Sequence, residues 1–321
     1  MWDHLRDPRT GAPVTLDVAA NDAAATEDAA TGGAATDGVT LRTRDGQPAA
    51  TWHPAERRLD WPIHAPLAHA EAAEWDRRAR ELAPFPLPRP DGPEWWDADI
   101  CRGASLDPIR RAHPSLGKVE GRRVLVLDGS GTDAWRFVEH GALRVDHVDV
   151  SSGMQRVALA RLRRMGTPTD RLLFHRVEAE ALPFRAASFD LAFARGTVHH
   201  LDRRRFFPEL HRVLAPGAEA LLLEPRLSPA LQSVLRLRRG LRRIDRGADR
   251  PLGDRDLETL RALFREVDVA FEGTLQPILT RLPRRARSRW SVRLRPVEGA
   301  LDARPRLGRW LGAFASVYLR R

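Results

Sequence analysis

A short glycine-containing segment is the first place where residue types and spacing could do chemistry. Residues 128–132 (DGSGT) follow an apolar run and precede a segment of helical composition. Glycine has no Cβ, so backbone amides at such a turn can approach a ligand closely, and the next helix adds N–H donors at its N-terminus. Asp128, Gly129 and Gly131 are therefore candidate ligand-binding residues. Residues 129–134 also satisfy the relaxed G-x-G-x-x-A pattern of dinucleotide-binding proteins, so this segment alone leaves the ligand open.

A carboxylate follows 18 residues after the second glycine. Asp149 lies near the end of a second strand-like run, where it can accept hydrogen bonds from both hydroxyls of a ribose. NAD and S-adenosylmethionine (SAM) both contain that ribose, so the carboxylate does not choose between them. An alternative is that Asp149 or Ser151 caps the following helix. The two roles are compatible.

The order of apolar runs and helical segments predicts the elements that position these residues. From residue 119 onward strand-like and helical segments alternate, and the continuous apolar run 124–127 is typical of a strand covered on both faces. This alternation predicts a doubly wound α/β fold with a parallel sheet. The expected strands are 124–127, 145–150, 171–177, 189–194, 220–223, 267–271 and 313–319, and the expected helices are 154–165, 204–214, 230–245 and 254–265.

The N-terminal part has a different composition. Residues 19–38 contain almost no large apolar side chain, so they cannot bury enough surface to offset the entropy of ordering, and they predict a mobile loop. Strand-like pieces at 14–16 and 39–41 flank the loop, a turn-rich piece ends at 59–63, and 68–83 has helical composition. We expect a small strand-and-loop cap over 1–66, linker and lid helices over 67–117, and the main domain over 118–321 with a substrate-side insert at 226–310.

Four further blocks in a fixed order carry a resemblance to a known family. They are residues 177–184 (VEAEALPF), 188–191 (SFDL), 198–201 (VHHL) and 209–217 (ELHRVLAPG). After a glycine segment and an acidic strand end, this series closely resembles the class I SAM-dependent methyltransferases, of the small-molecule and quinone-biosynthesis kind. The resemblance covers residues 124–225. It implies a Rossmann-like, doubly wound, seven-stranded and mostly parallel sheet with an irregular N-terminal cap and a C-terminal helical insert.

The resemblance implies roles for residues of the glycine segment and the second strand. Gly129 and Gly131 would contact the methionine and ribose portions of SAM, and Asp128 belongs to the same cofactor-binding set. Asp149 would bind the ribose hydroxyls, and Met154 would flank the adenine. The activity implied is methyl transfer to a small-molecule acceptor by in-line displacement.

The later blocks supply the remaining candidates. Glu178 and the backbone of Ala179 would recognise the amino edge of the adenine, and Arg195 would lie near the methyl group. His199 is the candidate catalytic base, which the reaction needs only if the acceptor must lose a proton. The alternative is that His199 is a turn residue without a catalytic role.

Two departures from the family pattern bear on cofactor binding. The family has an acid two places before the first glycine, where this chain has Leu127, and Asp128 stands one place later; successive residues of a strand point to opposite faces. The third glycine of the family is Asp133 here, which adds bulk and negative charge. These departures leave a non-catalytic binding module as one alternative. A NAD or flavin enzyme is another, but it explains none of the later blocks.

The composition of the chain bears on three kinds of partner: nucleic acid, a membrane and a metal ion. The net charge is +10, yet only one of the 53 basic residues is a lysine, which indicates biased residue usage, and we expect no nucleic-acid partner. No apolar run approaches the roughly 20 residues of a membrane span, and the N-terminus carries no apolar signal core, so we expect a cytoplasmic location. The single cysteine, Cys101, excludes a multi-cysteine zinc site, and we expect no metal.

Overall fold

The computed structural model describes residues 4–8, 13–15, 39–43, 48–82, 118–127, 129, 131–164, 166–226, 228–230, 250–279 and 282–321. The chain forms two compact units. The first comprises residues 1–85, 119–192 and 204–218, and the second comprises 86–118, 193–203 and 219–321. The expected loop 19–38, all of the expected helix 230–245 except its first residue, and Asp128 and Cys101 lie outside the described residues.

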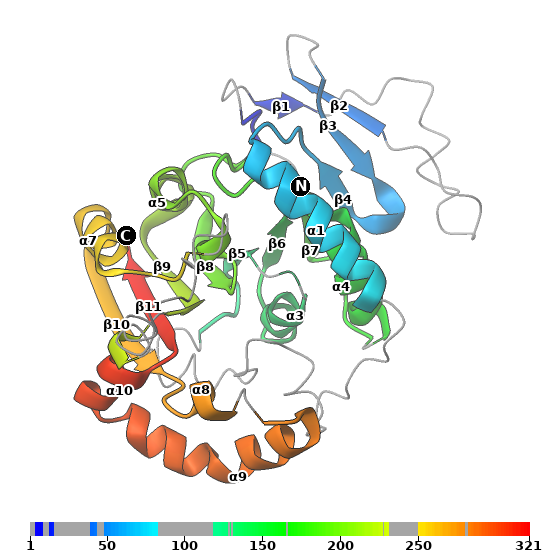
Figure 1. Cartoon of the computed structure of the whole chain (residues 1–321). Coiled ribbons are helices and arrows are strands. Elements are labelled where there is room, and N and C mark those ends of the chain that lie inside the picture. Colours follow the sequence, from blue (N-terminus) through cyan, green and yellow to red (C-terminus); the bar gives the residue numbers. More distant parts are fainter. Residues whose placement is uncertain are drawn as a thin grey trace. The chain divides into compact units, whose positions relative to one another are not determined.

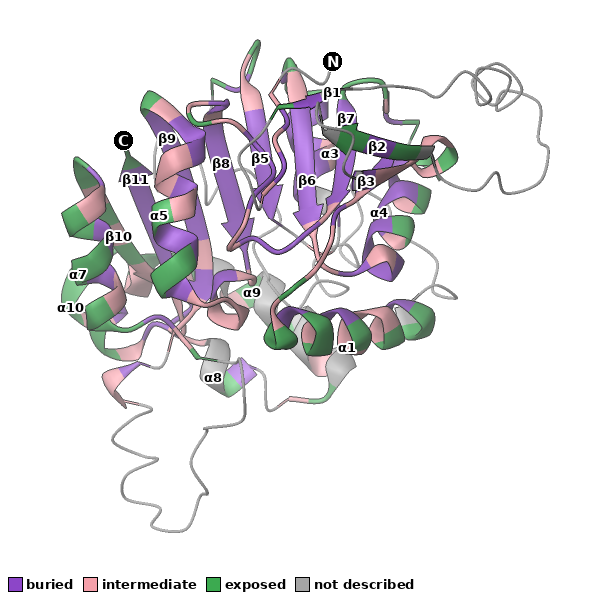
Figure 2. Cartoon of the chain, turned by 90° about the horizontal axis from the view of Figure 1, so that it is seen from above, coloured by how far each residue is buried: buried purple, intermediate pink, exposed green. Residues whose placement is uncertain are grey.

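Three parallel strands form the centre of the first unit, in the order β7 (Leu172–Arg176), β6 (Arg144–Asp149), β5 (Arg123–Leu127). Residues 124–127 are buried, as their continuous apolar run predicts (Figure 2). Helix α3 (Thr132–Glu139) follows β5, and α4 (Ser152–Arg164) follows β6. These parallel strands with crossover helices confirm the predicted α/β class. They bring the residues that follow β5 and β6 to one edge of the sheet.

Four N-terminal strands extend this sheet beyond β7. They are β1 (Val14–Thr15), β2 (Val39–Thr43), β3 (Pro48–His53) and β4 (Arg58–Asp60), which pair antiparallel in sequence order. Strand β4 then pairs parallel with β7, with Arg58 beside Phe174. Counted over all described residues, the structure has eleven strands where seven were expected for the sheet, because the N-terminal strands join it. Among these, β3 and β4 arise where the sequence indicated only turns. The domain boundary at residue 66 stays a prediction.

Helix α1 (Pro66–Leu82) packs along α4 in the first unit (Figure 1). Ala72 and Ala79, seven residues apart, are buried, whereas Arg77 and Arg80 are exposed, which is the pattern of a helix with one covered side. The approach is close, because a Cβ on Gly153 of α4 would lie 3.0 Å from the Cβ of Ala79.

A buried polar network joins the N-terminal segment to this sheet. The Oδ1 atom of Asp146 accepts hydrogen bonds from Nε2 of His175 at 2.8 Å and from Nε2 of His4 at 3.3 Å, and Oδ2 accepts from Arg144 at 2.6 Å. The indole N–H of Trp61 donates to Nδ1 of His175 at 3.4 Å. Burial disfavours the charge of Asp146, but the hydrogen bonds from His175 and His4 outweigh it and hold the pKa of Asp146 well below its usual range.

The second unit contains an antiparallel set in the order β9 (Leu214–Pro225), β11 (Phe314–Arg320), β10 (Glu266–Glu272). Strand β8 (Phe189–Arg195) carries the chain into this unit, and α5 (Arg203–Val213) precedes β9. Helix α7 (Asp254–Leu263) precedes β10, and α8 (Gln276–Leu279), α9 (Arg284–Asp302) and α10 (Pro305–Leu311) connect β10 to β11. The predicted strands and helices at 189–194, 204–214, 220–223, 254–265, 267–271 and 313–319 are thereby confirmed.

Candidate cofactor-binding site

Three predicted site residues meet at the edge of the first unit where β5 and β6 end. Gly129 follows β5, Asp149 ends β6, and Met154 lies in the first turn of α4. A Cβ on Gly129 would lie 3.3 Å from Oδ2 of Asp149 and 3.4 Å from Cε of Met154. The absence of a side chain at Gly129 therefore leaves space directly beside the Asp149 carboxylate, as a ligand-binding glycine requires.

The Asp149 carboxylate is held in a defined orientation. Its Oδ1 atom accepts a hydrogen bond from the backbone N–H of Ser151 at 2.7 Å, while Oδ2 faces Gly129. The cap of α4 comes from Ser151, whose Oγ accepts the N–H of Met154 at 3.0 Å. Of the two residues expected to cap this helix, Ser151 is the cap. Asp149 supports the same turn through Oδ1, while its Oδ2 faces Gly129.

A carboxylate from α1 completes this turn, a role that no sequence pattern indicates. Oδ1 of Asp76 accepts hydrogen bonds from Oγ of Ser151 at 2.5 Å and from the N–H of Gly153 at 2.8 Å. Asp76 lies in an ordinary amphipathic helix, 75 residues before Ser151, so no local pattern could reveal the contact. Helix α1 thus helps to fix the segment that carries Asp149 and Met154.

Gly131 has a packing role that differs from its predicted one. Its φ is +73°, and a Cβ there would lie 2.5 Å from the Cβ of Ala158 in α4. Both the positive φ and this contact exclude a side chain. Gly131 is therefore needed where α3 begins against α4, and its contact with SAM stays a prediction.

Asp133, at the position of the family's third glycine, is neutralised within its own helix. Its side chain is buried, and Oδ1 accepts a hydrogen bond from Nη1 of Arg136 at 2.8 Å. An acid in the first turn of a helix is also favoured by the helix dipole. The departure at Asp133 adds a negative charge near the expected cofactor position. In the structure this charge is paired with the buried Arg136 of the same helix.

Glu178 and Ala179 follow β7 at the same edge of the first unit. Oε1 of Glu178 accepts the backbone N–H groups of His64 and of Ala65, the latter at 2.8 Å. Glu178 and Ala179 are themselves nearly completely buried. Glu178 thus attaches the segment before α1 to the end of β7. Its recognition of adenine together with Ala179 stays a prediction.

In the second unit, His199 is bonded to a buried carboxylate that the sequence did not indicate. His199 lies in a short 3₁₀ helix, η6 (Val198–His200), and its Nδ1 is 2.8 Å from Oε2 of Glu224 in β9. Glu224 is fully buried, and its Oε1 accepts the N–H groups of Thr197 at 3.0 Å and Val198 at 2.9 Å. A glutamate inside the apolar run of β9 was the only sequence signal for this role.

The bonds around Glu224 fix the tautomer of His199. Oε2 of Glu224 also accepts the backbone N–H of His199 at 3.3 Å. A carboxylate oxygen only accepts, so opposite the Glu224 carboxylate Nδ1 of His199 donates, and a neutral ring then carries its lone pair on Nε2. Among the described residues Nε2 has no hydrogen-bond partner. Arg195 ends β8 and is buried, and its predicted position near the methyl group is untested.

Known proteins resemble the segment that contains these residues. The family model described as a methyltransferase domain matches residues 127–222, from the last residue of β5 into β9. The resemblance to class I methyltransferases that the motifs indicated is therefore confirmed for this segment.

Curated proteins with similar sequences include two that are named ubiquinone/menaquinone biosynthesis C-methyltransferase UbiE. The protein from Brucella anthropi is 38% identical over 105 residues, which cover 31% of this chain and 38% of that protein. The protein from Allorhizobium ampelinum is 35% identical over 137 residues, which cover 40% and 47%. The match thus spans less than half the length of these relatives.

Among solved structures, the [4+2]-cyclase SpnF is similar with 20% identity and a TM-score of 0.49, covering 81% of this chain and 97% of that one. In the described part of the chain, no helix is long and apolar enough to cross a membrane.

Proposed function

We propose that this chain is a SAM-dependent methyltransferase that acts on a small-molecule acceptor in the cytoplasm. The observation that carries the proposal is the meeting of Gly129, Asp149 and Met154 where β5 and β6 end, within the segment that matches the methyltransferase domain model. The curated relatives are named for methyl transfer to carbon in quinone biosynthesis, which supports a small-molecule acceptor.

The residues at this edge fit an adenosyl cofactor. The space beside Oδ2 of Asp149, which a Cβ on Gly129 would fill, suits a ribose hydroxyl. The bond from Ser151 to Oδ1 already orients the carboxylate, so binding requires little reordering. Met154 supplies an adaptable apolar surface for the adenine. Glu178, Ala179, Gly131, Asp128 and Arg195 complete the proposed cofactor-binding set.

The chain contributes mainly position and proton transfer. SAM, when bound, supplies a methyl group on a sulfonium, whose departing thioether needs no protonation. Holding two reactants in line can lower the barrier by about 7–11 kcal/mol. Where the acceptor must lose a proton, Nε2 of His199 accepts it, and Glu224 is the positioning residue that keeps Nδ1 protonated and stabilises the resulting imidazolium.

Calorimetric titration of the full chain with S-adenosylhomocysteine and, separately, with NADH tests the proposal. We expect the first to bind and the second not to bind. Asp149→Ala removes hydrogen bonds to a charged acceptor, each worth about 1.5–3 kcal/mol, so affinity should fall about tenfold or more. The control Glu139→Ala changes an exposed carboxylate of α3 and should leave the affinity unchanged. Binding of NADH alone would contradict the proposal.

A further inference from the structure

The positive charge of the chain is concentrated in two segments of the second unit. Residues 226–250 contain eight arginines and two aspartates, a net charge of +6, but most of them lie outside the described residues. Residues 282–311 contain nine arginines and two acidic residues, a net charge of +7, whereas the whole chain carries +10. This segment contains α9 and α10. A bias in residue usage alone would spread arginine along the chain, so the concentration needs a local explanation.

Both acidic residues of this segment bond inward. Asp302 accepts the backbone N–H groups of Gly273 and Thr274 at 3.1 Å each, and Glu298 accepts that of Leu275 at 3.1 Å. The two carboxylates thus hold the loop between β10 and α8. The exposed charged side chains that the structure describes in 282–311 are all arginines: Arg293, Arg304, Arg306 and Arg309.

Large apolar side chains are exposed on these two helices, α9 and α10, and on the adjacent α8. The described residues include six exposed large hydrophobic side chains, and four of them lie here: Ile278 (62% exposed), Trp290 (44%), Val297 (50%) and Trp310 (55%). Single exposed apolar residues are ordinary, but four of six within 33 residues form a concentration.

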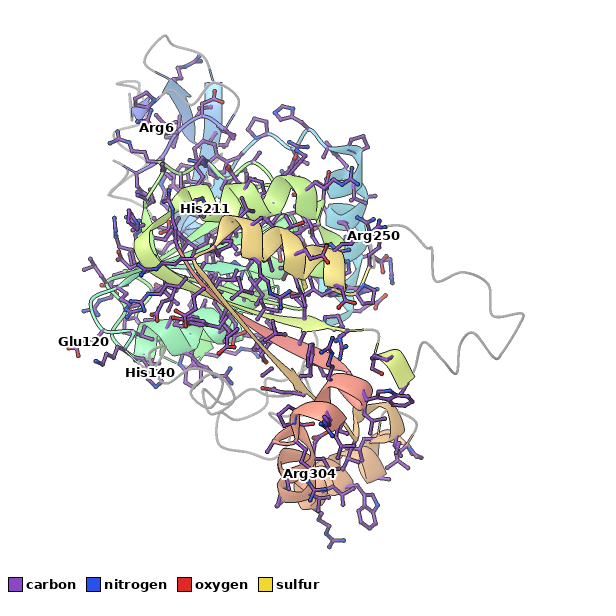
Figure 3. All side chains as sticks on the ribbon, turned by 90° about the vertical axis from the view of Figure 1, so that its left-hand side faces the viewer. Arg6, Glu120, His140, His211, Arg250 and Arg304 are labelled. Carbon is purple, nitrogen blue, oxygen red and sulfur yellow. The ribbon has the colours of Figure 1, made fainter. Side chains whose placement is uncertain are left out.

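Arginine and apolar side chains are interleaved on α9. Trp290, Arg293 and Val297 are spaced three and four residues apart, so they share one side of the helix. The Arg293 guanidinium lies 5.9 Å from the centre of the Trp290 ring. Helices α8 and α10 both contact α9, and α10 packs closely on β10, since a Cβ on Gly308 would lie 2.7 Å from the Phe271 carbonyl oxygen. Figure 3 labels Arg304 among these helices.

We propose that the exposed arginine and apolar side chains of α8, α9 and α10, which we call the α8–α10 surface, bind the face of an anionic lipid membrane. Interfacial helices combine arginine with tryptophan and aliphatic side chains, because the cations attract anionic headgroups while the apolar groups enter the headgroup boundary. A surface for nucleic acid needs arginine but gains little from exposed Ile278 and Val297. The proposal goes beyond the proposed methyl transfer and does not depend on it.

Cosedimentation of the full chain with vesicles tests this surface. We expect binding to vesicles that contain phosphatidylserine and phosphatidylcholine, none to phosphatidylcholine alone, and weaker binding as salt rises. The triple variant R293E/R306E/R309E should bind the anionic vesicles at least about tenfold more weakly. The matched control R80E/R164E/R205E reverses three exposed arginines of the first unit and should bind within about twofold of the wild type.

A second pair of variants separates a membrane from other anionic partners. W290A/W310A keeps every charge and should also weaken vesicle binding about tenfold. The control L67A/L143A removes two large hydrophobic side chains that are exposed elsewhere in the described part of the chain, and it should not weaken binding. Thermal unfolding establishes that each variant is folded.

Three results would overturn the proposal: no binding to anionic vesicles at low salt, equal losses in the variants and their controls, or tighter binding to a single-stranded RNA that W290A/W310A leaves unchanged. The last result would assign the surface to nucleic acid. Because none of these measurements uses SAM, they are independent of the cofactor titrations.

Discussion

At the scale of single residues, the two glycines of the 128–132 segment have different functions. Gly129 borders the Asp149 carboxylate, whereas Gly131 lies against Ala158 with a positive φ. The sequence placed both in one ligand-binding pattern, because spacing shows that a glycine is needed but not what it must avoid. The structure divides them into one residue beside the proposed ligand and one residue at a helix contact.

Substituting each glycine should separate binding from stability. Gly129→Ala should weaken S-adenosylhomocysteine binding about tenfold and destabilise the chain less than Gly131→Ala, because its Cβ would lie 3.3 and 3.4 Å from the ends of two side chains that can shift slightly. Gly131→Ala should destabilise the chain by about 2–4 kcal/mol, since it combines a clash with a positive φ. Gly121→Ala is the control for φ alone, because its φ is +72° and nothing lies within 4 Å. Calorimetry and urea unfolding measure the two effects; equal destabilisation by all three substitutions would contradict this division.

His199 and Glu224 make a prediction that needs no methyl acceptor. In ¹⁵N NMR spectra of histidine-labelled protein at neutral pH, the His199 ring should show a protonated Nδ1 and an unprotonated Nε2. Glu224→Gln places an amide where a carboxylate accepted four hydrogen bonds, so the preference for this tautomer should be lost. His199→Gln identifies the His199 resonances by their disappearance. A ring protonated at Nε2 in the wild type would exclude His199 as the proton acceptor.

At the scale of elements, the turn between β6 and α4 depends on a partner from α1. Ser151 caps α4 and donates to Asp76, so the two helices share one set of hydrogen bonds. Asp149 and Met154 flank this turn. Helix α1 therefore stabilises the proposed cofactor site through a contact between residues far apart in sequence.

A double-mutant cycle measures that coupling. Ser151→Ala should lower the free energy of unfolding by about 1–2 kcal/mol as a lost cap, and Asp76→Ala should also destabilise the chain. Because the two side chains are in contact, the double variant should lose less than the sum, with an interaction energy of about 0.5–3 kcal/mol. The neighbouring Ser152→Ala paired with Asp76→Ala should be additive. Additivity for Ser151 would show that α1 does not support this turn.

Elements with strong local patterns can be predicted from the sequence, whereas elements that depend on distant partners cannot. Residues 124–127 predicted a buried strand because their apolar run is continuous. Strands β3 and β4 were not predicted, because they are short, Pro54 separates them, and their pairing depends on β7. The role of Glu224 also depends on distant partners, because its hydrogen-bond donors at 197–199 lie 25 to 27 residues away in the sequence.

At the scale of the whole molecule, the buried network at Asp146 makes stability depend on pH. Burial lowers the pKa of His175 below its ordinary value of 6.5, and the hydrogen bond with Asp146 opposes this only in part. A lowered pKa in the folded state means that acid favours the unfolded chain. The contribution of His175 is complete above pH 6.5 and declines below it. The lowered pKa of Asp146 acts in the same direction below about pH 4.

The free energy of unfolding should therefore fall as the pH decreases from 6.5 toward 4. The part due to His175 has a slope of up to about 1.4 kcal/mol per pH unit. His175→Gln keeps an N–H donor for Asp146 but removes the titration, so its slope should be smaller. His69→Gln, at an exposed position, is the control. Urea unfolding at a series of pH values measures all three proteins, and equal slopes for His175→Gln and the wild type would contradict the assignment.

A crystal structure of the chain with S-adenosylhomocysteine would show the proposed cofactor site itself. We expect the ribose hydroxyls within hydrogen-bonding distance of the Asp149 carboxylate and Gly129 against the ligand. The Asp133 side chain should remain bonded to Arg136. A nucleoside bound elsewhere, or a ligand that makes no contact with Asp149, would contradict the proposed site.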